Sequence, residues 1–484
     1  MCGMNKHRVE FCENPLFVGC VFVLTLRGKE GTEKGRKDND MGYLRRKIDG
    51  TLEAWKSGEK RKPLLLKGAR QTGKTESVRH FAAKRYESVV EVNFVERPEF
   101  RQIVEGGFSA GEIVRRISML EPGLRFVPGG TLVFFDEIQE FPEIATSLKF
   151  FAQDGRWDVI ASGSLLGVHY RRIASHAMGY KTEAEMHSLD FEEFLWALGY
   201  GEEFVGDMYG HVAERRPFGT LELGVLRDRF RDYCILGGMP EVVAEYVGKG
   251  TFEGTLALQR SLVGGWRDDA RKYAGGLDQG RILNVLDHVP AQLAKENRKF
   301  QISKVAHGAR FRDYRGCVDW LADAGIVLPC HCLLSPSLPL KGNYDPDKFK
   351  LYLADTGLLV SMLDDVAQRD LRADRNFGIW GGALHENTVA EALRKSGLDL
   401  YYWKRGESPL EEDFFARDER HLVPIEVKAS NGRSRSLRTL IDEARYPDIA
   451  WGIKLADANV GFENKVLTLP RFCAFLLARL LGTG

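Results

Sequence analysis

The chain has almost no net charge, because 69 lysines and arginines stand against 68 aspartates and glutamates in 484 residues. This balance excludes a uniformly basic surface, so any binding of nucleic acid must come from a local patch. The eight cysteines are scattered without the spacing of metal ligands, and Cys330-x-Cys332 is one residue too tight for a zinc knuckle. We interpret them as free thiols in a reducing cytoplasm, which is the location we predict for the protein.

A run of apolar residues long enough to span a bilayer is also missing. The segment Leu16–Leu26 has only eleven residues, whereas a transmembrane helix needs about 20. A charged segment follows it where a signal peptide would have its cleavage site, and a helical pattern begins at Met41 and covers Gly42–Ile48. We therefore expect no membrane partner, and we interpret residues 1–40 as poorly ordered or artefactual, with translation starting at Met41.

The sequence has one Asp-Thr-Gly triplet, at residues 355–357, and lacks a second. Aspartic-protease chemistry needs two such carboxylates that share a proton. We therefore interpret Asp355 as part of a junction between a strand and a helix.

A phosphate-binding pattern follows the apolar residues Leu64–Leu66, and a helical pattern covers Glu76–Arg85. A glycine-rich loop between a buried strand and a helix directs backbone N–H groups and the positive end of the helix dipole at one point, which suits a polyphosphate. In this pattern the lysine reaches the β- and γ-phosphates, and the threonine hydroxyl binds Mg²⁺. The alternative is a glycine turn that matches by chance. The predicted nucleotide-binding residues of this loop are Gly68, Ala69, Arg70, Gln71, Thr72, Gly73, Lys74 and Thr75.

A second apolar run, Thr131–Phe135, ends in the acidic pair Asp136 and Glu137. A continuous apolar run is typical of a buried parallel strand, and ligands bind at the carboxyl ends of such strands. We predict that Asp136 holds the Mg²⁺ shell through water, while Glu137 orients or deprotonates the attacking water. The alternative is a strand that ends in a solvated acidic turn.

The middle of the chain has helical periodicity from about Phe218, and Thr255–Tyr273 is a predicted long helix that could cover the nucleotide. Residues 300–355 favour a winged helix, with a short helix at Lys304–Ala309 and wing strands near Val327–Leu333 and Phe349–Leu353. Such a unit binds protein as readily as DNA, and its basic side chains can also simply be solvated. These basic side chains are Lys304, His307, Arg310, Arg312 and Arg315.

A second chemical constellation lies near the C-terminus. A predicted helix carries Glu386, and two neighbouring strands carry Asp413 and the Glu426-x-Lys428 pair. Asp413 and Glu426 could share one Mg²⁺, with Lys428 beside them to polarise a water molecule and Glu386 as a third carboxylate. The alternative is an amphipathic strand with a solvated polar face.

The chain resembles prokaryotic AAA-type ATP-binding proteins whose C-terminal domain of unassigned function is similar to restriction-endonuclease folds. The resemblance covers roughly residues 41–460. In proteins of this type the strand beside the acidic strand ends in a residue that senses the γ-phosphate, a role that Ser162 or Ser164 could serve. The motifs that carry the resemblance are Gly68–Thr75, Phe135–Gln139, Gly163–Gly167, Leu189–Phe194, Gly237–Glu241, Phe349–Gly357 and Pro424–Lys428.

The resemblance implies an α/β fold and ATP and Mg²⁺ as cofactors, with ATP hydrolysis that involves Lys74, Glu137 and the two serines. We expect an AAA-type ATPase core at 41–205, a helical lid with a winged helix at 206–355, and a restriction-endonuclease-like domain at 356–484. One hypothesis is hydrolysis that repositions the C-terminal domain. The alternatives are an ATP-gated metal-dependent DNA nuclease and an ATP-binding interaction module without turnover. DNA, a protein partner and a second copy of the chain remain candidate partners.

Overall fold

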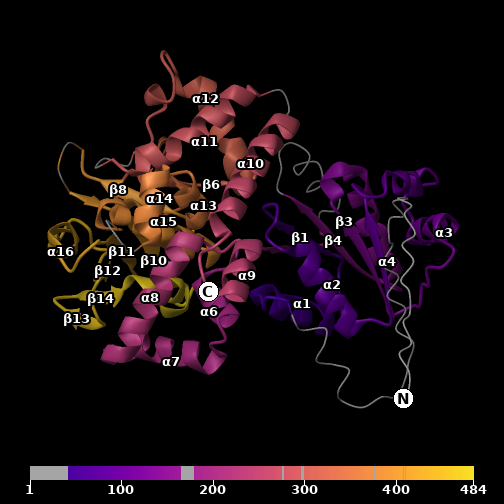
Figure 1. Cartoon of the computed structure of the whole chain (residues 1–484), viewed down its shortest axis with the longest axis horizontal. Helices are drawn as coiled ribbons and strands as arrows, with labels where there is room; N and C mark the ends of the chain where they lie inside the picture. The colour runs from indigo at the N-terminus through magenta and orange to yellow at the C-terminus, as the bar shows by residue number, and fades with distance from the viewer. Residues whose placement is uncertain are drawn as a thin grey trace, which may run out of the picture.

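The computed structural model has a mixed α/β fold (Figure 1). The expectation for residues 1–40, with a start at Met41, lies outside the residues that the structure describes. The helix predicted from Gly42 begins later, because Arg46 is extended and its backbone N–H donates to Asp49 Oδ2 at 2.9 Å, which caps α1 (Lys47–Ser57). Within the described part, no helix is both long and apolar enough to cross a membrane. The described residues are 42–164, 179–274, 277–295, 299–373, 377–406, 408 and 410–483.

The N-terminal part is built on a parallel five-stranded sheet with the order β2-β3-β4-β1-β5. Strand β4 therefore lies between the strand that leads into the glycine-rich loop, β1, and the acidic strand, β3. All six residues of β3 are buried, as expected for a parallel strand covered on both faces. The strands are β1 (Leu64–Gly68), β2 (Ser88–Asn93), β3 (Thr131–Asp136), β4 (Asp158–Ser164) and β5 (Thr182–Glu185).

Helices cover both faces of this sheet, and alternate residues of one strand pack on opposite sides. Phe134 packs in the cluster that contains residues of α1 and α2, whereas Phe135 packs in the cluster that contains residues of α3 and α4. The covering helices are α2 (Lys74–Arg85), α3 (Ala110–Leu120) and α4 (Ser147–Asp154), with 3₁₀ turns at Pro98–Val104, Ile138–Glu140 and Pro142–Thr146.

The helical middle separates this sheet from the C-terminal sheets (Figure 1). The predicted helix Thr255–Tyr273 is confirmed as α10, with the predicted bounds. Helix α8 ends where predicted, because Gly237 at its C-cap has a positive φ of 70°. The helices are α6 (Phe191–Ala197), α7 (Glu202–Ala213), α8 (Thr220–Leu236), α9 (Pro240–Lys249), α10, α11 (Gln279–Leu293) and α12 (Phe311–Asp323).

Two further sheets form the C-terminal part, with the orders β7-β6-β8-β9 and β10-β11-β12-β14-β13. Their strands are β6 (Val327–Leu333), β7 (Tyr344–Leu353), β8 (Tyr401–Lys404), β9 (Glu411–Glu412), β10 (Phe414–Arg417), β11 (Leu422–Val427), β12 (Gly452–Ala456), β13 (Gly461–Glu463) and β14 (Val466–Pro470). The helices are α13 (Thr356–Ser361), α14 (Asp365–Arg372), α15 (Phe377–Lys395), α16 (Arg435–Asp442) and α17 (Leu477–Leu480), with a 3₁₀ turn at Arg471–Leu476.

The predicted winged helix is found only in part. Strands β6 and β7 pair as an antiparallel hairpin, and α12 lies before them. In place of the predicted helix Lys304–Ala309 the chain forms a 3₁₀ turn, Ile302–Lys304. Strand β6 also pairs in parallel with β8, so the hairpin is part of a larger sheet and does not project as a wing.

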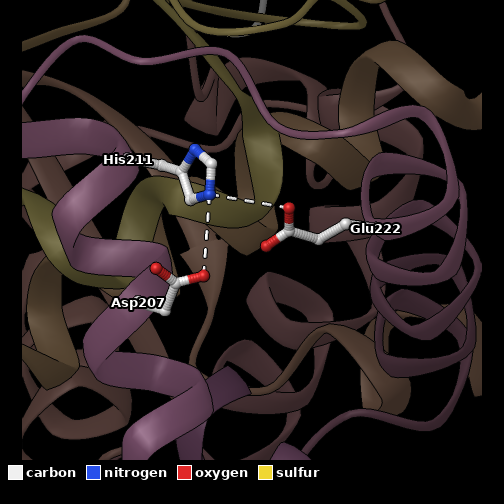
Figure 2. Close-up of side chains that lie close together, drawn as sticks. All are labelled: Asp207, His211 and Glu222. Carbon is white, nitrogen blue, oxygen red and sulfur yellow. Dashed lines mark ion pairs between the residues drawn. The ribbon is translucent and has the colours of Figure 1, made fainter.

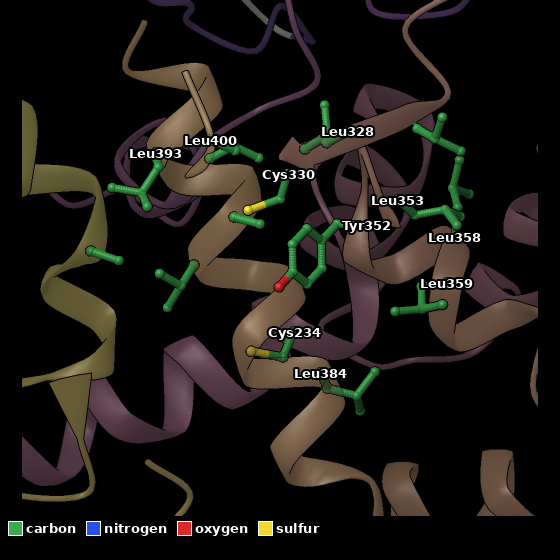
Figure 3. Packing of buried hydrophobic residues seen from close by; sticks show 14 of the residues in the cluster. Cys234, Leu328, Cys330, Tyr352, Leu353, Leu358, Leu359, Leu384, Leu393 and Leu400 are labelled. Atoms are coloured by element: carbon green, nitrogen blue, oxygen red, sulfur yellow. The ribbon is translucent and has the colours of Figure 1, made fainter. Parts of the chain in front are cut away.

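Residues from the middle and from the C-terminal part share one hydrophobic core (Figure 3). Cys234 of α8, Cys330 of β6, Tyr352 of β7, Leu358 of α13 and Leu384 of α15 are all buried in it. The sheet of β7, β6, β8 and β9 likewise runs across the expected boundary between residues 355 and 356. The division into an extension and three domains stays a prediction, and this boundary passes through a continuous core.

Candidate functional site

The glycine-rich loop has the backbone geometry that its sequence predicts. A Cβ at Gly68 would lie 2.1 Å from the carbonyl oxygen of Met186, so only glycine fits there without a backbone shift. Gly73 and Gln71 have positive φ angles of 92° and 61°. Gly73 is the N-cap of α2, and no side chain of the described residues caps this helix end. The first N–H groups of α2 therefore face the loop without a side-chain acceptor, as an anion site requires.

Lys74 is buried beneath this loop. Its Nζ donates to the carbonyl oxygens of Gly68 at 3.1 Å and Ala69 at 2.7 Å. Burial lowers the pKa of Lys74 to about 8, and the nearby carboxylates of Glu137 and Asp136 oppose that decrease. A phosphate group beside the ammonium would favour its charged form.

Asp136, at the end of β3, is the centre of a buried polar cluster. Its Oδ2 accepts hydrogen bonds from Thr75 Oγ1 at 3.0 Å and from Asn93 Nδ2 at 3.2 Å, and its Oδ1 accepts one from Ser162 Oγ. Burial raises the pKa of Asp136 to about 6, the hydrogen bonds from Ser162 and Thr75 lower it, and Glu137 raises it further. The structure thus brings together three residues that the sequence predicted, Thr75, Asp136 and Ser162.

Sequence reasoning missed Asn93, the fourth member of this cluster. It is the last residue of β2 and lies directly opposite Asp136 in the parallel register. The available signal was a polar residue at the end of an apolar strand, a position where parallel sheets place ligand-binding groups.

Glu137 follows Asp136 in a left-handed conformation with a φ of 55°. Its Oε2 accepts a hydrogen bond from the side-chain amide of Gln139, and the Oε1 of that amide accepts one from the backbone N–H of Ser164 at 3.0 Å. The Ser164 hydroxyl is buried without a hydrogen-bond partner among the described residues. Gln139 therefore connects the predicted catalytic glutamate with the end of β4.

A buried arginine that the sequence analysis did not single out supports the loop from behind. Arg46 donates to the carbonyl oxygens of Thr72 at 2.8 Å and His187 at 2.6 Å, and its Nε donates to Glu193 Oε1 at 3.1 Å. Its side chain is only 4% exposed. Because a planar guanidinium holds several acceptors in fixed directions, Arg46 fixes the loop relative to α6.

Another residue of the loop contacts α10. Arg70 forms an ion pair with Asp269, and its guanidinium lies 5.8 Å from the ring centre of Tyr273. The Tyr273 hydroxyl in turn donates to Glu140, which follows the acidic strand. Helix α10 thus contacts both segments that carry the predicted nucleotide-binding residues.

A cavity of about 450 Å³ adjoins the loop. Its lining residues include Ala69 and Thr72 of the loop, Trp266 of α10 and Leu328 of β6. A volume of this size is in the range of small-molecule sites, which typically measure about 300–1,000 Å³.

The predicted C-terminal constellation contains a residue that the sequence analysis missed. Lys350 of β7 is buried, and its Nζ lies 3.2 Å from Glu386 Oε1, 3.1 Å from Glu411 Oε1 and 3.7 Å from Asp413 Oδ1. Tyr352 also donates to Glu386. A lysine ammonium therefore lies among carboxylates for which the sequence suggested a metal ion. No local pattern in the sequence predicts that Lys350 lies among these carboxylates, because Lys350 belongs to a strand that carries none of the predicted residues.

The remaining predicted residues lie beside this cluster. Glu426 Oε1 is 2.7 Å from Lys428 Nζ, and Asp413, in the break between β9 and β10, accepts from the backbone N–H of Val427 at 2.9 Å. Glu412 is fully buried, and burial followed by the charge of Glu426 raises its pKa well above the usual value. Among the described residues, the carboxylate oxygens of Glu386, Asp413 and Glu426 do not all lie within 4.8 Å of one another.

Three motifs outside these sites meet at one buried junction. The Asp355 carboxylate accepts from Gly238 N at 2.8 Å and from Ser188 Oγ at 2.9 Å, and it also caps α13. This confirms the interpretation of the Asp-Thr-Gly triplet as a junction of strand and helix. Lys395 of α15 donates to Ser188 Oγ and to the carbonyl oxygen of Leu189, both at 2.8 Å.

The loop, the acidic strand and the strand order define a P-loop domain with a parallel sheet. Residues 60–195 match the family described as an AAA domain, a class of ATP-binding ATPase domain. Residues 227–369 match a domain of unknown function, DUF8612, and residues 381–472 match another, DUF4143. A search of curated proteins gave no match.

Among solved structures, the chain is similar to the Walker-type ATPase PABY2304 of Pyrococcus abyssi, with 15% identity, 67% of this chain and 97% of that chain covered, and a TM-score of 0.43. It is also similar to the Aeropyrum pernix ORC1 protein in complex with DNA, with 13% identity, 68% and 91% covered, and a TM-score of 0.23. At these scores the likenesses add nothing to the argument from the site.

Proposed function

We propose that the protein is a Mg²⁺-dependent ATPase whose hydrolysis changes the contact between the P-loop domain and the rest of the chain. The observation that carries the proposal is the single cluster formed by the loop threonine Thr75, Asp136 and Ser162, next to the buried Lys74. Thr75 and Asp136 supply hard oxygen atoms, which fit Mg²⁺. When bound, Mg²⁺ neutralises charge on the phosphates.

Each residue of the cluster then has a defined role. The N–H groups of the loop and of the first turn of α2 bind the phosphates, and Lys74 exchanges its bonds to the loop carbonyls for phosphate oxygens. Glu137 accepts a proton from the attacking water, and Gln139 holds the glutamate in position. Ser164, with its buried hydroxyl, is the better placed of the two serines to sense the γ-phosphate, because the Ser162 hydroxyl is bound to Asp136.

Two contacts support coupling to the remainder of the molecule. Arg70 of the loop is paired with Asp269 of α10, so a shift of the loop on phosphate binding changes the position of this helix. Ser188 and Leu189, which follow β5, accept hydrogen bonds from Lys395 of α15. We propose that these contacts transmit the nucleotide state to the C-terminal region.

The test is phosphate release from ATP with Mg²⁺ by the full chain, with and without double-stranded DNA. We expect Lys74→Ala to abolish turnover, whereas Lys84→Ala, on an exposed position of the same helix, leaves it unchanged. Glu137→Gln should bind ATP normally and hydrolyse it at least about 100-fold more slowly, the usual effect of losing a general base.

Unchanged turnover in Glu137→Gln would contradict the proposed role of that residue. Tight ATP binding with negligible phosphate release in the wild type would support an interaction module instead. Faster phosphate release in the presence of DNA would identify DNA as a partner. If DNA does not change the rate of phosphate release, the partner to be sought is a protein or a second copy of the chain.

A metal-dependent nuclease is the second candidate function. It is favoured by the buried carboxylate of Glu412, whose two oxygens have no hydrogen-bond partner among the described residues, beside Glu426 and Lys428. Metal binding there requires Lys350 to withdraw from Asp413. The expected signature is Mg²⁺-dependent DNA cleavage that Asp413→Ala abolishes, and a failure to cleave any form of DNA would exclude this function.

A further inference from the structure

A histidine and two carboxylates meet outside both sites, between the helices α7 and α8 (Figure 2). His211 Nε2 lies 3.6 Å from Asp207 Oδ2 and 3.6 Å from Glu222 Oε2. Asp207 and His211 are four residues apart on α7, so they share one face of that helix. Glu222, in the first turn of α8, approaches from the other side.

The orientation of the histidine ring is fixed by its other nitrogen. His211 Nδ1 lies 3.0 Å from the carbonyl oxygen of Arg216, so it carries the proton and donates it. In the neutral ring Nε2 then presents a lone pair to two carboxylates. Glu222 Oε2 also accepts a hydrogen bond from the backbone N–H of Gly219 at 3.3 Å. Nε2 and the two carboxylate oxygens nevertheless face one another, and a cation between them would remove their mutual repulsion. A hydrogen bond from the second ring nitrogen to a carbonyl is also the usual support of a metal-binding histidine.

The distances between the ligand atoms distinguish a metal ion from a shared proton. Both N···O separations of 3.6 Å are longer than a hydrogen bond, which is normally about 2.7–3.2 Å. In a tetrahedral site with metal–ligand distances of about 2.1 Å, two ligand atoms lie about 3.4 Å apart. All the ligand atoms of this group lie within 4.8 Å of one another. The spacing therefore fits a small metal ion better than a shared proton.

We propose that Asp207, His211 and Glu222 bind a divalent transition-metal ion of the Zn²⁺ type. One imidazole and two carboxylates form a nitrogen and oxygen set that suits Zn²⁺, with a fourth position for water. The His211 side chain is 5% exposed and that of Asp207 is 60% exposed, so the site has a rigid inner ligand and an open outer side. Arg216 lies 3.4 Å from the other oxygen of Asp207, but exposed pairs of this kind are weak.

The metal would stabilise a contact between the helical middle and the C-terminal sheet. The ring of His211 stacks on Phe218 at 4.5 Å, and Phe218 exchanges two backbone hydrogen bonds, of 2.9 and 2.8 Å, with the side chain of Asn459. Phe218 also packs against Phe472 with 5.4 Å between ring centres. Fixing α7 to α8 at His211 therefore holds Phe218 against the C-terminal part.

The test uses the full chain, freed of metal by a chelator and titrated with Co²⁺, whose absorption spectrum reports coordination geometry. We expect one Co²⁺ per chain with a tetrahedral spectrum, displaced by Zn²⁺ and accompanied by a higher melting temperature. His211→Gln and Asp207→Asn should weaken binding at least about tenfold. His421→Gln is the matched control, because His421 faces one carboxylate, that of Asp418, at 3.4 Å, and should bind Co²⁺ as the wild type does.

Asp207→Asn changes an exposed side chain, so it tests the site even if His211→Gln does not fold. Absence of a stoichiometric Co²⁺ spectrum in the wild type would overturn the proposal and leave the cluster as a group of side chains that binds no metal. Equal binding by the wild type and both variants would overturn it as well.

Discussion

A substitution of Lys350 tests how the buried carboxylates around it are stabilised. Its side chain is 2% exposed and lies within 4 Å of carboxylates of Glu386, Glu411 and Asp413. Lys350→Met keeps most of the apolar stem and removes the ammonium. Removing one partner of a buried ion pair typically costs about 3–5 kcal/mol, because the remaining charge is left without compensation. We expect a loss of that size in the free energy of unfolding.

The assay is equilibrium unfolding in urea, followed by a signal from the C-terminal part. The control is Lys348→Met, the same substitution two residues earlier on β7. Lys348 is 54% exposed and pairs with Asp345 at 2.8 Å, so its loss should cost less than about 1 kcal/mol. Equal effects of the two substitutions would refute the reasoning.

The same variant tests whether the carboxylates can hold a divalent cation. Without the ammonium, three acidic groups lie close together, and a bound cation would replace its charge. We expect Mn²⁺ to stabilise Lys350→Met more than the wild type, by about 2.7 kcal/mol at a concentration 100 times the dissociation constant. If Mn²⁺ has the same effect on both proteins, the cluster is an ion-pair network and not a latent metal site.

Two further predictions concern the P-loop domain and the buried junction. Because the pKa of Asp136 is raised to about 6, protons compete with Mg²⁺ for its carboxylate below that pH. The affinity for Mg²⁺–ATP, measured by calorimetric titration, should therefore fall as the pH decreases through about 6. The same pH dependence in Asp136→Asn and in the wild type would contradict this. Gly238→Ala would place a Cβ 1.8 Å from a backbone carbonyl oxygen and should destabilise the protein by roughly 2–4 kcal/mol in urea unfolding. Gly248→Ala, in α9, would place a Cβ with no atom of the described residues within 4 Å, so it should be neutral or stabilising. Similar losses at both glycines would show that close packing is not the cause.

Local patterns in the sequence were sufficient to predict the N-terminal AAA-type domain. An apolar run followed by Gly68–Thr75 is a local signal, because the loop, its strand and its helix are contiguous in the chain. The acidic strand was found in the same way, and the parallel sheet then brings Asp136 to Thr75. The bounds of α10 were also predicted, since a long amphipathic helix has a periodic pattern.

The tertiary structure decided what these local patterns could not. Arg46 precedes α1 and donates to the loop residue Thr72, and Asn93 donates to Asp136 from the end of β2. Lys350 reaches the C-terminal carboxylates from β7. A 3₁₀ turn at Ile302–Lys304 stands in place of the predicted helix at 304–309. The predicted free wing is instead a hairpin whose strand β6 pairs with β8, a long-range contact that a short local pattern does not predict. Motifs and helical periodicity can therefore be recognised from residues that are neighbours in the sequence. Charge compensation and the strand order of the sheets depend on contacts between residues far apart in the sequence.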